Sequence, residues 1–293
     1  MNDSLKQSQQ TGDHSTNIQA QTVEIHHHGL TVPEVRKEFM ALFEANFYRL
    51  QSVARETAEQ RAKEVTEKFL GELAARNPAG LLAARDPDMQ AAVFTAQREY
   101  ARSGGEDLEQ VLVELLVQRA TAKDLPRIVL NEAIAVASKL TEIQLDTLSL
   151  LLVFVHDAPI RRVFESWSDL GHYLNGFIGP VIPATADDPG DLMHLKYTGC
   201  ISTDLGGKKL SYRIVQAFAK NARLNTAWRD VGDTSFLAQL CELEPRLGAI
   251  RRAYEKGRLP IDGIQLTTVG IALANANLRR KTGLEFDLGT WIG

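Results

Sequence analysis

The sequence predicts a mainly α fold, in which a body of many helices follows a short N-terminal β strand or hairpin. Over most of the 293-residue chain, apolar residues recur every three or four positions. Ser, Thr, Asp or Pro precedes many of these runs, as at helix starts. Residues 15–25 instead alternate between apolar and polar side chains, which is typical of a strand.

Composition narrows the class of protein. Hydrophobic residues make up 44% of the chain and charged residues 24%, which is enough for a packed core. The net charge of −4 argues against a protein that binds nucleic acid by charge alone. Cys200 and Cys241 are too few for a disulfide framework, and the opening residues have no apolar signal-peptide core. The longest apolar run, 148–155, is far short of the roughly 20 residues that a membrane helix needs. We expect a cytoplasmic protein without membrane contact.

The polar tail Met1–Thr11 leads into residues 15–25, here called the N-terminal β segment. Its apolar side chains fall in two registers, which change near Gln21, so we expect a bulge or turn there. A lone strand is unstable and must pair with something. Three interpretations stay open: an edge strand on the chain's own body, pairing between copies of the protein, or disorder. The residues that would mediate oligomerisation are Ile18, Gln19, Ala20, Val23 and Ile25.

Three consecutive histidines follow this segment. Alternation would place His26 and His28 on one face, which makes them weak candidates for metal ligands. No Cys or carboxylate lies nearby at ligand spacing, so a solvated turn before a helix is the favoured interpretation. We expect no cofactor.

The first helix has a clear start. Thr31 and Glu34 form a capping box, and Leu30 with Val35 forms a hydrophobic staple. The apolar spacing continues through Leu50 and Val53, so we predict one long helix from Thr31 to about Arg76.

Further helices are marked by their boundaries. Asp86-Pro87 opens a helix that ends at Gly104-Gly105, and Asp124, Thr141 and Thr267 are predicted caps of later ones. The helix behind Thr141 is the most apolar, so we place it at the centre. Pro245 interrupts a helix over 234–256, and the apolar tail at Trp291 and Ile292 is expected to dock on the body. A Pro- and Gly-rich break begins at residue 179. The predicted domains are therefore 1–30 (tail and β segment), 31–178 (helical, with the long first helix) and 179–293 (α-rich).

Catalytic and nucleotide-binding motifs are absent from the sequence, which has no P-loop, GxGxxG, HExxH, CxxC or GxSxG. We therefore predict that the protein is not an enzyme, with an effector enzyme of unrecognised site as the remaining alternative.

Three segments resemble parts of a winged-helix domain. LTEIQLDTLSLLLVF resembles its opening helix, LKYTGCIS the end of a recognition helix turning into the wing, and IQLTTVGIALA the return strand and closing helix. Roughly 60 residues separate Ile201 from Ile264, where a wing usually has a few. This resemblance implies a winged-helix-like C-terminal part that binds nucleic acid.

Charge gives that alternative some support. Residues 208–281 contain 14 Lys and Arg against 6 Asp and Glu. A basic face could contact phosphates. Alternatively, these cations favour a helix C-terminus and face acidic residues of a neighbouring copy. The candidate nucleic-acid contacts are Arg251, Arg252, Lys256, Arg258, Arg279 and Arg280.

Five segments together resemble a family of uncharacterised bacterial proteins: GDHSTNIQA, HHHGLTVPEVRKEFMALFEANFYRL, LTEIQLDTLSLLLVF, HLKYTGCIS and LTTVGIALANANLRRKTGLEFDLGTWI. Relatives share the GD-STNIQA opening, and many carry Gly-Gly where this chain has Gln21-Thr22. The opening also resembles short motifs at the front of bacterial conflict and signalling proteins, some of which nucleate amyloid-like or ring assemblies. These resemblances imply a self-associating interaction or regulatory protein with a role in phage defence.

Overall fold

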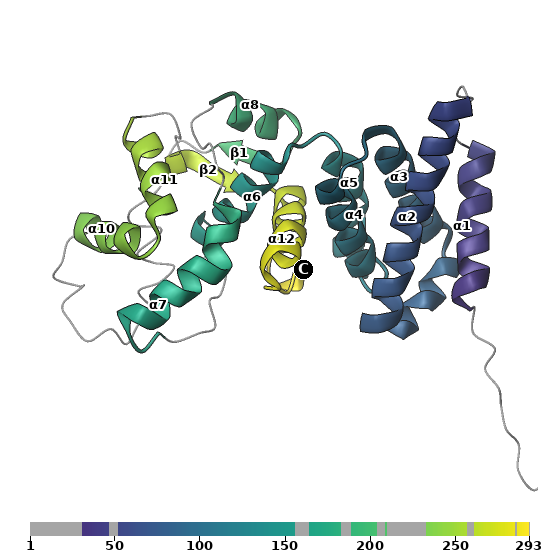
Figure 1. Cartoon of the computed structure of the whole chain (residues 1–293), viewed down its shortest axis with the longest axis horizontal. Helices are drawn as coiled ribbons and strands as arrows, with labels where there is room; N and C mark the ends of the chain where they lie inside the picture. The colour runs from purple at the N-terminus through teal and green to yellow at the C-terminus, as the bar shows by residue number, and fades with distance from the viewer. Residues whose placement is uncertain are drawn as a thin grey trace, which may run out of the picture.

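The computed structural model describes residues 31–46, 52–155, 164–182, 189–203, 209, 233–256, 261–284 and 286–292. These residues form an elongated, mainly helical molecule, as predicted (Figure 1). The N-terminal half consists of α1 (Val32–Asn46), α2 (Ser52–Arg76), η1 (Pro78–Arg85), α3 (Pro87–Ser103), α4 (Glu106–Arg119), α5 (Asp124–Ala137) and α6 (Glu142–Val155).

The second half has shorter elements. They are α7 (Trp167–Tyr173), η2 (Leu174–Ile178), η3 (Gly179–Val181), α8 (Pro189–Tyr197), β1 (Ile201–Thr203), α10 (Asp233–Leu243), α11 (Pro245–Glu255), η4 (Ile261–Gly263), β2 (Ile264–Leu266), α12 (Thr268–Thr282) and α13 (Gly289–Ile292). The predicted interruption at Pro245 is confirmed, because this proline starts α11.

Helices α1–α5 form one end of the molecule, and α7, α10 and α11 lie at the other (Figure 1). Between them, α12 packs against α6, α4 and α5. One hydrophobic core therefore runs through both halves of the sequence. The predicted division at residue 179 stays a prediction about domain organisation.

The central position of α6 is confirmed. Leu148 and Leu152 are fully buried, and neighbouring side chains of the same helix are almost as inaccessible. Its partner α12 is also buried on nearly all sides, with Ala272, Ala274 and Ala276 fully enclosed. Small side chains let the two helices approach closely, so α12 is the second central helix of the fold.

The prediction of one long helix from Thr31 to Arg76 is wrong. Two helices, α1 and α2, occupy this range and pack against each other. The ring centroids of Phe39 and Phe69 are 6.5 Å apart across this contact. The apolar spacing was misleading at Val53, whose side chain is 74% exposed. The predicted start is confirmed in part: the Glu34 carboxylate accepts hydrogen bonds from both the backbone N–H and the hydroxyl of Thr31 (each 2.8 Å).

β1 and β2 pair antiparallel, with Ile201 opposite Leu266 and Thr203 opposite Ile264. Both strand positions agree with the predicted ones, whereas the likeness to a winged-helix domain stays a prediction. Directly after β2, Thr267 caps α12 as predicted, because its hydroxyl accepts from the backbone N–H of Gly270 (3.1 Å).

Other boundary signals had mixed outcomes. Asp86 and Thr141 are confirmed as caps, since their side chains accept from backbone N–H groups two and three residues on. Asp124 is not the cap of α5: it is the first helical residue, with a left-handed φ of 51°, and Lys123 precedes it at the N-cap. Ile292 is 1% exposed, which confirms that the C-terminal tail docks on the body.

Within the described residues, none of the helices combines the length and the apolar character that a bilayer crossing requires.

Candidate functional site

The described residues include none of those predicted to mediate assembly or bind metal, and not Arg258 of the predicted nucleic-acid contacts. The following lie outside the described residues: Ile18, Gln19, Ala20, Val23, Ile25, His26, His28 and Arg258. Among the residues that the structure does describe, no group of three or more His, Cys, Asp or Glu side chains could hold a metal ion. The assembly and metal predictions therefore stay predictions.

The structure does not bring the remaining basic candidates together. Arg251, Arg252 and Lys256 lie on α11, whereas Arg279 and Arg280 lie in the last turn of α12. β2 leads from α11 to the opposite end of α12, and a 15-residue helix is about 22 Å long. In Figure 1, α11 and α12 are separate helices, and α12 lies nearer the centre of the molecule. Arg252 and Lys256 are exposed, and Arg251 pairs with Glu255 of the same helix at 2.8 Å.

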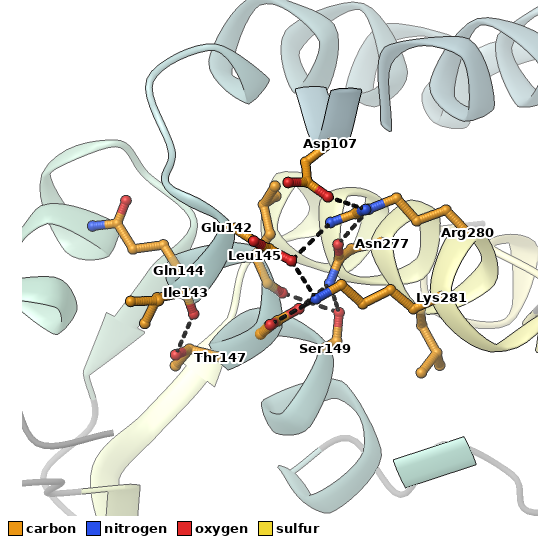
Figure 2. A network of polar contacts seen from close by, with 12 residues as sticks. Asp107, Glu142, Ile143, Gln144, Leu145, Thr147, Ser149, Asn277, Arg280 and Lys281 are labelled. Atoms are coloured by element: carbon orange, nitrogen blue, oxygen red, sulfur yellow. Dashed lines mark hydrogen bonds and ion pairs between the residues drawn. The ribbon is translucent and has the colours of Figure 1, made fainter. Parts of the chain in front are cut away.

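Arg280 belongs to a buried polar network (Figure 2). Its side chain is only 7% exposed. The guanidinium donates to the Asp107 carboxylate of α4 (2.6 Å) and to the side-chain oxygen of Asn277 (2.8 Å). Glu142 of α6 lies 4.0 Å away. These contacts join three helices, so Arg280 is occupied within the fold.

The same network continues along α6. The amide of Asn277, which is fully buried, donates to Asp146 (3.0 Å) and to the hydroxyl of Ser149 (2.9 Å). Lys281 donates to Asp146 and Glu142 at 2.8 Å (Figure 2). Burial raises the pKa of Asp146, and the hydrogen bonds from Lys281 and Asn277 oppose that shift. The network therefore fixes the register of α12 on α6.

A second buried cation lies on α4. Arg119 is 2% exposed and pairs with Asp88 of α3 and with the side-chain oxygen of Asn131 on α5 (2.8 Å). Burial favours the neutral form of Asp88, but the hydrogen bond from Asn131 and the charge of Arg119 outweigh it, so the pKa of Asp88 is lowered. This group ties α3, α4 and α5 together and is structural in character.

A recess lies where the ends of four helices meet. A cavity of about 760 Å³ opens between the C-terminal ends of α2, α4 and α12, the start of α5 and the docked tail. Its cationic walls are Arg76, Lys123 and Arg279. Its apolar walls include Leu130, and Phe286 of the tail. We call this space the tail cavity; its volume lies in the range of small-molecule sites, about 300–1,000 Å³.

One carboxylate pairs with two guanidinium groups beside the tail cavity. Glu114, whose side chain is 9% exposed, accepts from Arg76 in a bidentate pair (2.7 and 3.1 Å) and lies 3.4 Å from Arg279. Burial lowers the pKa of Arg279, although Glu114 opposes the shift. The side chain of Gln118 also donates to Glu114 (2.9 Å), and its oxygen is buried with no hydrogen-bond partner in the structure.

Sequence reasoning did not find the tail cavity. Its cations come from residues 76, 123 and 279, which lie in three separate helical segments, and no local spacing links them. The only signal was the expectation that Ile292 docks on the body, because docking of the tail supplies one wall.

Comparison with protein families gives a match over most of the chain. One family model matches residues 29–227 and, in a second stretch, residues 221–292. The chain belongs to this family. The family match covers nearly all of the helical body and begins after the N-terminal β segment. Its description names no activity.

The search of curated proteins and the search of solved structures gave no match.

Proposed function

We propose that this protein is a self-associating interaction or regulatory protein, in which the N-terminal β segment joins copies and the helical body presents binding surfaces. The observation that supports the proposal best is the start of the body. α1 begins at Val32 and carries its own cap at Thr31, and its inward side chains Val35 and Phe39 are 2% and 1% exposed. A helix with buried inward side chains thus follows the segment after six intervening residues.

The chemistry of the segment favours pairing between copies. Asn17, Gln19 and Gln21 repeat at every second position, and stacked amides of this kind stabilise strands of identical chains. The family match starts at residue 29, four residues after the segment ends. By resemblance of the opening motif, we place the protein in the cytoplasm of a bacterium and in a conflict or phage-defence pathway.

The mass in solution tests this proposal. Ala20→Pro and Val23→Pro, each made in the full chain, remove a strand N–H group and should reduce assembly. Light scattering should give a multiple of 32.4 kDa for the wild type and a smaller mass for these variants. The matched control Gln10→Pro, in the polar tail, should assemble like the wild type. A wild-type monomer at all concentrations, or equal masses for all four proteins, would refute self-association through this segment.

A second function has one structural observation in its favour. On α8, which leads into β1, Met193 is 71% and Tyr197 86% exposed, four residues apart on one helix face. Lys196 beside them is also exposed. An aromatic ring and a cation on one surface suit stacking on bases and contact with phosphate.

We therefore keep nucleic-acid binding as the alternative proposal. Fluorescence anisotropy with single- and double-stranded oligonucleotides should show affinity that falls steeply as salt rises. Tyr197→Ala should weaken it, whereas Lys139→Ala, an exposed change two residues after the end of α5, should not. Affinity that is absent at low salt, or equal loss in both variants, would reject the alternative.

A further inference from the structure

We propose that the tail cavity binds a small organic anion, whose phosphate or carboxylate group lies against the cationic wall and whose apolar body lies against the tail. The inference concerns a different surface from the N-terminal β segment and does not depend on self-association. It rests on the charge, the size and the composition of the cavity walls.

Charge is the first argument. The wall has three cations, Arg76, Lys123 and Arg279, and one carboxylate, Asp287. Glu114 lies behind the wall and is shared by the two guanidinium groups. Among the described residues, the wall and the carboxylate behind it thus carry three positive charges and two negative ones.

Two of the three cations, Arg76 and Arg279, are partly shielded from water, whereas Lys123 is exposed. Glu72 approaches Arg76 at 3.9 Å, but its side chain is 55% exposed, so solvent weakens its effect. Arg279 is 22% exposed, and burial lowers its pKa. An anion in the cavity would replace the lost hydration of this guanidinium and form charge-assisted hydrogen bonds, for which guanidinium geometry is well suited.

Size and composition give the class of ligand. A volume of about 760 Å³ is far larger than a single ion needs and suits an organic molecule. Leu130, Pro126 and Phe286 contribute apolar lining, and Asn77 is one of the polar lining residues. A ligand with one anionic end and one ring or short apolar chain would match both kinds of surface.

The side chain of Asn275 helps to hold the tail wall in place. Asn275 of α12 donates to the backbone carbonyl of Phe286 (2.9 Å) and accepts from the backbone N–H of the same residue (3.0 Å). The pair imitates a backbone ladder and holds Phe286 at the cavity. The site therefore exists as a preformed recess between a rigid helix and a docked tail.

Calorimetry on the full chain tests the inference with paired probes. AMP and adenosine differ by a phosphate group, and benzoate and benzamide differ by a carboxylate charge. We expect AMP or benzoate to bind at least tenfold more tightly than its neutral counterpart. Binding of AMP would indicate that the site accepts a phosphate group, and binding of benzoate that it accepts a carboxylate. Binding should weaken as salt rises.

Three variants complete the test. Lys123→Glu reverses an exposed charge at the cavity and should weaken binding at least fivefold, whereas Lys139→Glu, an exposed change near the other end of α5, should not. Thr121→Trp, also at an exposed lining position, should fill the cavity and abolish binding. The inference is overturned if neither anion binds at about 1 mM. Equal binding of the neutral probes, equal effects of the two lysine variants, or full binding by a folded Thr121→Trp protein would also overturn it.

Discussion

Replacing Gly270 by alanine should destabilise the protein, although alanine favours helices. Gly270 lies in the first turn of α12, where the helix passes over the chain that enters β1. A Cβ atom at this position would fall 2.0 Å from the backbone oxygen of Cys200 and 3.0 Å from its carbonyl carbon. Because these are backbone atoms, no rotamer change relieves the overlap, and α12 and β1 must move apart.

The expected cost is worked from the contacts at this crossing. Thr267 donates to the Cys200 carbonyl through its backbone N–H (3.0 Å) and its hydroxyl (3.1 Å). Each bond contributes about 1 kcal/mol, and overpacking costs about 1–3 kcal/mol. The higher helix propensity of alanine offsets up to about 1 kcal/mol of this destabilisation. The free energy of unfolding should therefore fall by about 3 kcal/mol.

Urea unfolding followed by far-UV circular dichroism measures this change. With an m value of about 3 kcal/mol/M, the midpoint should fall by about 1 M. Gly71→Ala is the matched control, because Gly71 is an exposed glycine of α2 and its added Cβ meets nothing within 4 Å. This control should gain about 0.5–1 kcal/mol. A Gly270→Ala protein as stable as the wild type, or equal losses in both variants, would refute the close approach of α12 to β1.

Three further perturbations have expected outcomes. Burial raises the pKa of Asp146 in the folded protein, so this carboxyl group stabilises the fold fully below the ordinary carboxyl pKa, and the stabilisation is lost as pH rises through the raised pKa. Asp146→Asn should therefore flatten the fall of the unfolding free energy with rising pH, as measured by urea unfolding at several pH values. An unchanged slope would contradict this prediction. Arg119→Met should lower the free energy of unfolding by about 2 kcal/mol at neutral pH, and by less as pH falls, because the pKa of Asp88 would no longer be held so low. A loss of stability that does not change with pH would contradict the pairing of Arg119 with Asp88. Asn275→Ala removes both hydrogen bonds to Phe286 and should speed hydrogen exchange in residues 286–292 but not in α2, whereas unchanged exchange would show that the tail docks without them.

The sequence predicted helix boundaries well where a side chain satisfies backbone groups locally. Asp86, Thr141 and Thr267 are such cases. The break between α1 and α2 was missed because no Gly or Pro marks it and the apolar spacing continues through Val53. That side chain is exposed, so spacing alone does not distinguish a core stripe from an exposed apolar residue.

The sequence predicted that basic residues of the second half contact negative groups, but not which groups these are. Arg279 and Arg280 were expected to meet either phosphates or acidic residues of another copy. Arg279 pairs with Glu114, and Arg280 lies against Asp107 and Glu142, all of which belong to the acidic first half of the same chain. These residues are separated by more than 100 positions, so only tertiary packing brings them together. For the same reason, the sequence did not predict the tail cavity.

The position of α12 has a consequence for synthesis on the ribosome. The helix covers α4, α5 and α6, yet it leaves the ribosome after all of them. Until then, Leu148 and Leu152 on α6, fully buried in the finished fold, lack part of their cover. A chain stalled before residue 268 would therefore expose an apolar surface that chaperones and proteases recognise. Completion of the body is thus delayed until nearly the whole chain has been made.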